Sequence, residues 1–532
     1  GGGNNITATE IASSSTLTLK SDTISLSPYS QNVVAVNDVD TTNSGTTMQT
    51  LEAGTFRRNN TSGDYYSDKW WNTLIGKDGN YMFISNSISW TNDSLSSLQY
   101  VKIYKKQSSG DLYGDGDGNP GPFQTITYGD ITGSPSSMRE WARDLQIDQN
   151  GDLLMIDASE NHNTQQKWYV YYKTSSNWAP INCDGTNSNI RTFPQVGNLP
   201  NNSHILNKLS ANGQLLVLSN NHQNPDSTGR FVLFKVALTG SGSSTEIFFT
   251  HVVTVDGTNE YTGGSITRWA HLGSCCSVAN DGTILVGSYN RNSSWSNFKC
   301  KVYVYKYDVD ADSFNSSPIW TWEEPDGYRN NYTEQIEAGS ITSDGNYIAF
   351  SSHGQDNPEN STNNYGWIRV YKKNNASGTD WVRVGGPSGG DSDLFGGTLW
   401  GSTVNGGNVF MGQTFVTIDK VDGTLRLLQS AHQSSRVNYV NGWASLYKFR
   451  EGADSDWVLV KSHDGTTSSE FGRAASLGHN YYVIGSQQDN PSAQSNVNNV
   501  VKSKAYVYDI ETTVISSSNV ATTSANVSGE LT

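Results

Sequence analysis

Four histidines stand at similar points of the sequence, each shortly after an apolar segment that ends in small polar residues: His162, His222, His353 and His432. Imidazole nitrogens bind metals and carry protons near neutral pH, so such a set could form a ligand site. None of the four has a Cys or an acidic partner at the spacing of a metal site. The pattern therefore favours hydrogen-bonded loop residues over a ligand-binding ring of histidines.

Motifs of common enzyme classes are missing from the sequence. It contains no G-x-S-x-G, H-E-x-x-H or phosphate-binding loop. Glu323 and Glu324 are adjacent carboxylates, but Pro325 follows them and nothing pairs with them. A sialidase-like site needs an Arg triad, a Tyr nucleophile and an acid, and the segment 341–350 matches the S-x-D-x-G-x-T-W box only in part. We predict that the chain is not an enzyme, although residues far apart in sequence can still assemble a site.

The cysteines give no sign of a metal or redox centre. They are Cys183, Cys275, Cys276 and Cys300, with no C-x-x-C spacing. A disulfide, either Cys183–Cys275 or Cys276–Cys300, and unpaired core thiols both agree with the sequence.

Composition excludes several classes of protein. The 532 residues include 35 basic and 50 acidic ones, for a net charge of −15. Nucleic-acid binding needs a basic face, and no run of Lys or Arg exceeds two residues, so we expect no nucleic-acid partner. No stretch of about 20 apolar residues occurs, which argues against membrane insertion. The first residue is Gly, so we expect a processed or partial chain.

One unit recurs through the chain: an apolar strand, a D-G or N-G turn, and a second apolar strand. Such turns between apolar strands are the strongest local signal for a β-hairpin, and a type I′ turn is expected at them. The units are 74–85, 145–157, 206–219, 277–288, 340–352, 416–430 and 476–486.

A Tyr-rich strand follows each hairpin after a polar loop. These strands are 100–106, 168–173, 231–236, 301–308, 367–373, 443–449 and 505–510. Seven interleaved repeats of this kind predict an all-β fold, a seven-bladed β-propeller of four-stranded antiparallel blades. Little chain remains after 505–510, so we expect a segment from the N-terminal region, Ile24–Val36, to pair into the last blade and close the ring.

The flanks of the repeats are different in character. Residues 4–27 and 512–532 are Ser- and Thr-rich with alternating Ile, Leu and Val. They resemble the low-complexity β-repeats of viral and phage fibre stalks, and the alternative is a flexible linker. We therefore divide the chain into an N-terminal stalk-like segment (1–29), the propeller (30–511) and a C-terminal stalk-like segment (512–532), the two ends being short β-rich extensions.

The last unit carries a more specific signature. Phe471-Gly472, the strand 483–486, Asp489-Asn490 and the strand 505–508 resemble the FG-GAP repeat of integrin α-subunit propellers and their bacterial and viral relatives. The fifth unit matches in part, through 351–360. The other units keep the strand pattern without the Phe-Gly pair.

This resemblance implies calcium, because integrin-type propellers carry D-x-D-x-D-G-x-x-D loops that wrap one Ca²⁺ in oxygen ligands. The nearest match is Asp115, Asp117 and Asn119, but Phe123 stands where the closing carboxylate belongs. A second, poorer match is Asp308–Asp312. A solvated turn is the alternative at both places, and no other cofactor is expected.

These observations lead to one functional prediction. We expect a non-catalytic structural or adhesion protein of a virion tail or fibre, or of an extracellular surface assembly, with the propeller as attachment module. Its partners would be its own copies, other structural subunits, or a cell-surface glycan or protein receptor. The alternative is a secreted carbohydrate-binding or carbohydrate-processing propeller. Binding would use the loops 86–99, 158–167, 220–230, 289–300, 353–366, 431–442 and 487–504.

Overall fold

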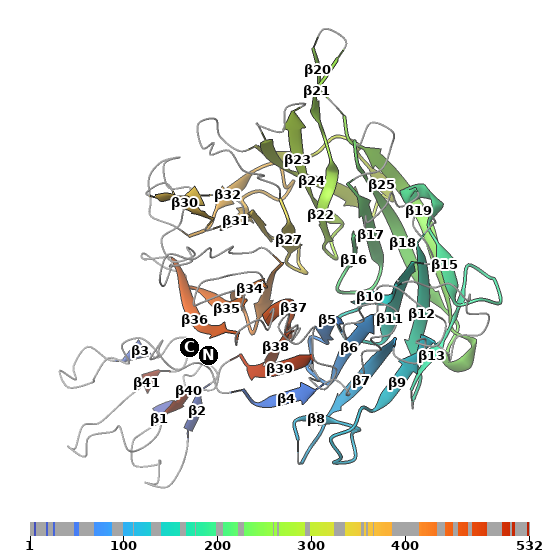
Figure 1. Ribbon diagram of the computed structural model, residues 1–532, viewed down its shortest axis with the longest axis vertical. Coiled ribbons are helices and arrows are strands. Elements are labelled where there is room, and N and C mark those ends of the chain that lie inside the picture. The colour runs from blue at the N-terminus through green and yellow to red at the C-terminus, as the bar shows by residue number, and fades with distance from the viewer. Residues whose placement is uncertain are drawn as a thin grey trace, which may run out of the picture.

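The fold is a ring of seven β-sheets arranged around an axis, as Figure 1 shows. It is taken from a computed structural model, and the prediction of a seven-bladed β-propeller is confirmed. The structure describes residues 5–6, 17–19, 25–26, 47–52, 69–87, 99–109, 111–128, 140–159, 166–175, 177–197, 206–221, 228–258, 260–262, 265–292, 298–323, 336–352, 356–357, 360–364, 366–385, 414–432, 442–450, 456–465, 471–486, 503–510, 513–515 and 529–530.

The first three blades run outward from the axis, innermost strand first. Blade 1 comprises β5 (Lys69–Ile75), β6 (Tyr81–Ser87), β7 (Tyr100–Lys106), β8 (Tyr113–Gly114) and β9 (Gln124–Thr127). Blade 2 comprises β10 (Glu140–Ile147), β11 (Leu153–Ser159), β12 (Lys167–Lys173), β13 (Trp178–Pro180) and β15 (Ile190–Thr192). Blade 3 comprises β16 (Leu206–Leu209), β17 (Leu215–Asn220), β18 (Arg230–Thr239), β19 (Glu246–Asp256) and, parallel to β19, β14 (Asn182–Cys183). Two 3-10 helices, η4 (Pro194–Val196) and η5 (Gly242–Ser244), lie in the connections.

The remaining blades repeat this plan. Blade 4 comprises β22 (Leu272–Val278), β23 (Thr283–Asn292), β24 (Phe298–Asp308), β25 (Ser313–Phe314) and β26 (Trp320–Glu323), extended by the hairpin β20 (Glu260–Thr262) and β21 (Ser265–Trp269). Blade 5 comprises β27 (Ala338–Ile341), β28 (Tyr347–Ser352), β31 (Trp367–Lys373) and β32 (Trp381–Arg383), with a separate pair β29 (Asp356–Asn357) and β30 (Asn360–Asn364). Blade 6 comprises β33 (Phe415–Val421), β34 (Thr424–Ala431), β35 (Trp443–Arg450) and β36 (Asp456–Asp464). Blade 7 comprises β37 (Phe471–Leu477), β38 (Tyr481–Ser486), β39 (Lys504–Asp509) and β4 (Gln49–Glu52).

The second strand of a blade is apolar on both faces because a neighbouring blade covers each face. Every residue of β17 is buried. Leu216 and Leu218 pack into a cluster shared by blades 2 and 3, whereas Leu215 and Val217 pack into the cluster between blades 3 and 4. Strand periodicity of two produces this division, and it explains why the sequence reads as a continuous apolar run.

The ring is closed by β4, a strand from the N-terminal region that pairs with β39 as the outermost strand of blade 7. Closure of this kind is confirmed, but the prediction that Ile24–Val36 supplies the strand is wrong. Ser25–Leu26 forms β3, which pairs elsewhere, and Val33–Val36 lies outside the described residues. The closing segment Gln49–Glu52 has a single strongly apolar residue, Leu51, so its sequence gives little strand signal.

The hairpin turns between the first two strands of each blade gather at one end of the ring, here called the turn face; the opposite end is the loop face. A type I′ turn, with positive φ at both central residues, occurs at Asp422-Gly423, where φ is 50° and 81°. At Gly79, Gly151, Gly213, Gly282 and Gly345, the glycine has positive φ but the preceding residue does not. The prediction of type I′ turns is therefore wrong at those five hairpins. Their connections are longer, as in blade 1, where the N–H of Gly76 donates to Tyr81 O (3.0 Å) and that of Gly79 to Gly76 O (2.9 Å).

Backbone hydrogen bonds link neighbouring turns around the axis. The N–H of His479 donates to Lys77 O (2.8 Å), that of Lys77 to Gln149 O (2.7 Å) and that of Gln149 to Ala211 O (2.7 Å). Four consecutive blades, from blade 7 through blade 3, are joined in this way at the turn face.

The Phe-Gly pair of blade 7 is a joint between blades. Gly472 has a φ of 86°, and a Cβ there would lie 2.9 Å from both Ser430 Cβ and Trp443 O of blade 6. Blade 4 repeats this geometry without the phenylalanine: Gly273 has a φ of 95°, and its Cβ would lie 2.8 Å from Ser219 Cβ. The backbone feature therefore recurs in a unit whose sequence lacks the Phe-Gly pair.

The two flanking segments of the sequence pair with each other. Strand β2 (Leu17–Leu19) pairs with β40 (Thr513–Ile515), and β41 (Gly529–Glu530) lies between β1 (Asn5–Ile6) and β3 (Ser25–Leu26). Figure 1 draws these strands outside the ring, and three residues separate the end of β39, in blade 7, from the start of β40. In the described part of the chain, no helix has the length and hydrophobicity of a membrane span.

Candidate functional site

A ring of buried polar residues marks the loop-face end of the second strand in every blade. Six are serines and the seventh, in blade 2, is an aspartate: Ser85, Asp157, Ser219, Ser288, Ser351, Ser430 and Ser486. In blade 1, Ser85 Oγ accepts the N–H of Asn72 (3.2 Å) on the inner strand, and in blade 2, Asp157 Oδ1 accepts the N–H of Asp144 (2.6 Å). In blades 1 and 2 this side chain satisfies a backbone N–H where the inner strand is irregular, and blade 2 alone has a charged residue at the position.

Asp144 joins three blades near the axis. Its Oδ1 accepts from Asn72 Nδ2 of blade 1 (2.6 Å) and from the N–H of Leu145 (2.8 Å). Its Oδ2 accepts from Asn207 Nδ2 of blade 3 (2.6 Å). Burial raises the pKa of the Asp144 carboxyl above its ordinary value, and the ammonium of Lys208 acts in the opposite direction.

This arrangement fits a scaffold better than a catalyst. The carboxylate oxygens of Asp144 already accept several N–H donors, so few lone pairs remain for a substrate proton. Asp157 is similarly engaged, since its Oδ2 accepts from Gln166 Nε2 (2.8 Å). Asp157 Oδ1 accepts the backbone N–H of Asp144 and not a proton of its carboxyl group, which is unlike the shared proton of a catalytic dyad.

Two lysines reach across the axis to the inner strand of blade 6. The Nζ of Lys208, on blade 3, lies 5.8 Å from the centre of the Phe415 ring. Lys77, in the turn of blade 1, forms an ion pair with Asp419. Asp419 Oδ1 also accepts from the Ser343 hydroxyl of blade 5 (3.1 Å). Side chains from both sides therefore meet at β33.

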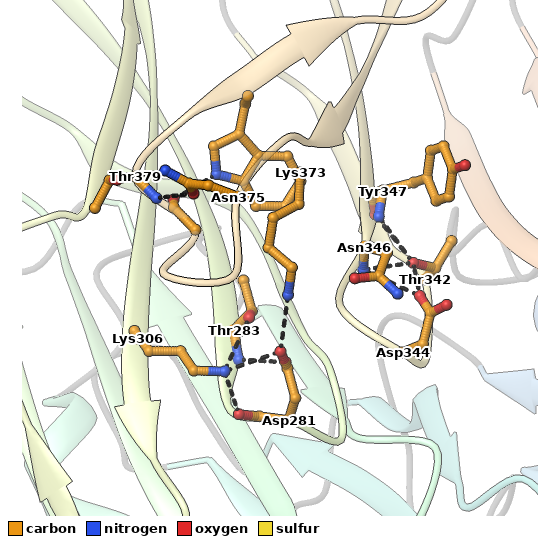
Figure 2. Close-up of polar contacts among 12 residues, drawn as sticks. Asp281, Thr283, Lys306, Thr342, Asp344, Asn346, Tyr347, Lys373, Asn375 and Thr379 are labelled. Atoms are coloured by element: carbon orange, nitrogen blue, oxygen red, sulfur yellow. Dashed lines mark hydrogen bonds and ion pairs between the residues drawn. The ribbon is translucent and has the colours of Figure 1, made fainter.

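Lysines at the ends of third strands tie adjacent blades together at the turn face. In Figure 2, Lys306 and Lys373 converge on Asp281, with Nζ–Oδ2 distances of 2.9 and 3.2 Å. Lys306 belongs to the same blade as Asp281, whereas Lys373 comes from blade 5. In the same way, Lys173 of blade 2 lies 4.5 Å from the ring centre of Tyr81 in blade 1. Lys173 and Lys373, at the ends of Tyr-rich strands, thus join adjacent blades, whereas Lys306 makes its ion pair within blade 4.

The turn of blade 5 is fastened by its own side chains, as Figure 2 shows. Thr342 Oγ1 donates to Asp344 Oδ1 (2.7 Å) and accepts the N–H groups of Asn346 (3.2 Å) and Tyr347 (3.0 Å). This is the segment that partly matches a sialidase box, and here it makes a rigid hairpin turn.

Of the four histidines, the structure describes His432. Its Nδ1 lies 2.7 Å from Thr414 Oγ1, and its Nε2 faces Arg473 on the inner strand of blade 7. The prediction that these histidines are hydrogen-bonded loop residues is therefore confirmed for His432. His162, His222 and His353 lie outside the described residues, as does part of each loop expected to bind partners.

The residues of the expected calcium loop lie between β8 and β9. Asp115 Oδ2 accepts from Asn119 Nδ2 (2.6 Å), and Oδ1 accepts the N–H groups of Asp117 (2.8 Å) and Asn119 (3.1 Å). Hydrogen bonding from Asn119 and Asp117 lowers the pKa of the Asp115 carboxyl. The structure brings Asp115 and Asn119 together, while Asp117 contributes its backbone. Among the described residues no three His, Cys, Asp or Glu side chains form a metal-binding group, and calcium stays a prediction.

The second acidic segment is engaged in ion pairing. Lys235 of blade 3 binds Asp312 (2.5 Å), and Asp308 Oδ1 accepts the N–H groups of Asp310 (3.1 Å) and Ala311 (2.9 Å).

The four cysteines are free thiols in the core, which agrees with the unpaired alternative. Burial raises the pKa of the Cys275 and Cys276 thiols, so they are poor nucleophiles.

Sequence reasoning missed the Asp144 cluster, although one signal was available. Asn72 and Asp144 each stand seven residues before a turn glycine, Gly79 and Gly151. Blades 3, 4 and 5 have Leu206, Cys275 and Ala338 at that spacing, so aligning the units on their turns isolates the polar pair.

Solved propellers resemble the chain in overall architecture. The WD40 repeats of RRP9 match with a TM-score of 0.42 and 8% identity over 88% of this chain and 99% of that one. The propeller domain of the Trilobed protease from Pyrococcus furiosus gives 0.40 and 8%, over 85% and 98%. The periplasmic gluconolactonase PpgL of Pseudomonas aeruginosa gives 0.38 and 12%, over 84% and 97%. No protein-family model and no curated protein matches the chain.

Proposed function

We propose that this protein is a non-catalytic display module, whose paired flanking segments mount a seven-bladed propeller on a larger assembly. The assembly would be a virion tail or fibre, or an extracellular surface structure. One observation carries the proposal: the first and last segments pair with each other in β2–β40 and in β1–β41–β3. Both attachments therefore leave the ring at one place, as a mount requires.

The link between mount and ring is short. Strand β39 ends at Asp509 and β40 begins at Thr513, so three residues separate blade 7 from the paired segments. A connection of this length limits how far the propeller can swing relative to its mount. Copies held on a common support would then present their rings in similar orientations.

Other observations support an adhesive role. The last unit resembles the FG-GAP repeat of adhesion propellers through Phe471-Gly472, and its glycine serves as a joint between blades. The carboxylates near the axis, Asp144 and Asp157, are bound in scaffold hydrogen bonds. Partners at the mount would be further copies or other structural subunits. At the loop face, a surface glycan or protein receptor would bind the polar loops, with calcium at Asp115, Asp117 and Asn119 as an optional support.

Removing residues 1–27 and residues 512–532 in separate variants tests the proposal. We expect each variant to keep a folded ring, because the closing strand begins only at Gln49, and to lose attachment to its native particle or surface. Attachment equal to that of the full chain contradicts the proposal. A glycan array run beside a polysaccharide hydrolysis screen covers the alternative, and cleavage by the purified protein would replace display with catalysis.

A further inference from the structure

The outer edge of blade 7 is filled by a strand from a distant part of the chain. Residues 471–509 supply its first three strands, and β4 then adds to the edge of β39, with Gln49 opposite Val507 and Leu51 opposite Ala505. The N–H of Met48 extends the ladder by donating to Val507 O (2.9 Å). The edge of β39 is thus an acceptor for a strand that is not continuous with it.

Gln49 anchors this strand to the neighbouring blade. Its Nε2 donates to Tyr113 O (2.9 Å), and its Oε1 accepts the Tyr113 N–H (2.7 Å). Both residues are buried. A side-chain amide that pairs with both backbone groups of one residue is selective, because a shorter or apolar side chain would leave those groups without partners.

Leu51 provides the apolar contact two residues later, on the same face of the strand. It is 6% exposed and packs with residues of blades 1 and 7, among them Ile75 and Val507. Thr50, between the two anchors, is exposed. Main-chain pairing combined with pockets for alternate side chains is how proteins recognise an added strand. The edge of β39, together with Tyr113, therefore selects a strand with the sequence Gln-x-Leu.

We infer that this acceptor site also takes β4 from a second copy of the chain, giving strand-exchanged dimers or chains of copies. The contacts are the same in either case, because the donor strand is identical. Residues 53–68 connect β4 to blade 1, and a chain of 16 residues can extend to at most about 55 Å, so its length does not confine β4 to its own ring. Closure within one chain prevails in dilute solution, where a tethered strand has an effective concentration of about 1 mM. Exchange prevails where copies are crowded. The inference rests on the proposed function in one respect, because the proposed assembly is what would bring the copies close together.

Two single-cysteine variants of the full chain test the exchange. Thr50 and Tyr506 are register partners across β4 and β39. Thr50→Cys and Tyr506→Cys proteins are mixed at a series of concentrations that approaches the effective concentration of the tethered strand, about 1 mM, and are then mildly oxidised. The four native thiols are buried. We expect a covalent dimer containing one copy of each variant, with a yield that rises with protein concentration. The double variant in a single chain should form the same bond internally in dilute solution, which checks the register.

A matched pair gives the background of random collisions. Thr379 is exposed in a turn of blade 5 and has no contact with β39, so Thr379→Cys replaces Thr50→Cys in the control mixture. The expected yield with Thr50→Cys is at least several-fold higher, and Gln49→Ala or Leu51→Ser added to the donor should lower it. A yield equal to the control overturns the inference, as does a double variant that fails to close. Because purified protein is used, a negative result leaves the test of attachment by truncation unaffected.

Discussion

Blades 2 and 7 secure their inner strands by different chemistry. In blade 7, the backbone of Gly472 packs against Ser430 and Trp443 of blade 6, in a space that a Cβ would fill. In blade 2, a non-glycine residue, Ala142, has a positive φ of 60°, and the nearby Asp144 binds side chains of blades 1 and 3. A joint made by close backbone approach is sensitive to side-chain volume. A joint made by a carboxylate depends on keeping each of its hydrogen-bond partners.

The largest effect is expected at the glycine joint. Gly472→Val places a branched side chain 2.9 Å from a backbone oxygen and at a φ of 86°. Strain and overpacking should together lower the free energy of unfolding by about 2–5 kcal/mol. Urea denaturation measures the change. Gly121→Ala is the control, since nothing lies within 4 Å of its added methyl group. An equal loss of stability in both variants would contradict the role of Gly472 as a joint between blades 6 and 7.

A smaller loss is expected at the carboxylate joint. Asp144→Leu removes the acceptor of the buried Asn207 amide, at about 1–3 kcal/mol. The loss of the same acceptor costs less at Asn72, which is only half-buried. Replacing Asn72, Asp144 and Asn207 together by leucine should restore much of the stability, because no amide is then left without an acceptor. At the position of Asn72 and Asp144, blades 3, 4 and 5 have Leu206, Cys275 and Ala338. The melting temperatures of the single and triple variants measure this difference in stability. A triple variant less stable than Asp144→Leu would show that this region needs polar residues.

The comparison also shows what a sequence can and cannot predict. The pattern of two apolar strands and a turn is local, so the seven hairpins could be located from it. The closing strand could not be, because Gln49–Glu52 owes its place to Tyr113 and β39, which are distant in sequence. Pairing between Thr18 and Val514 is equally long-range, and each segment alone gives only an alternating pattern. The Asp144 cluster depends on which residues of three blades meet near the axis.

Acid should weaken the seam between blades 6 and 7. Burial lowers the pKa of His463 to about 3 from 6.5, and its Nε2 lies 2.6 Å from the Tyr482 hydroxyl. The unfolded chain therefore binds a proton that the folded chain does not, and stability falls as the pH drops below 6.5 toward 3. The loss between pH 6.5 and 5 is about 2 kcal/mol.

His463→Gln should remove this loss, as measured by chemical denaturation at several pH values. Asp148 acts in the opposite sense, since burial raises its pKa to about 6 and its folded form gains stability as the pH falls from 6 toward 3.8. Asp148→Asn is therefore the matching control, and it should make the acid loss steeper. Parallel pH profiles for His463→Gln and the unaltered protein would contradict the assignment.

Metal removal should have the smallest effect. The ring is held by aromatic packing, such as Trp141, Trp168 and Trp443 in the core, and each buried aromatic removes about 150–250 Å² from water. We expect EDTA to leave the melting temperature unchanged within a few degrees. A large drop that Ca²⁺ reverses would instead show that Asp115, Asp117 and Asn119 hold a structural ion.

The paired flanks underlie the proposed function, and one cross-link tests them most directly. Thr18 and Val514 are register partners in β2 and β40. A Thr18→Cys and Val514→Cys double variant should form an internal disulfide under mild oxidation in dilute solution, detected as a monomer that lacks both free thiols. A Thr18→Cys and Thr379→Cys variant should stay reduced. If the first pair stays reduced as well, or links only between molecules, the flanks do not form a common mount.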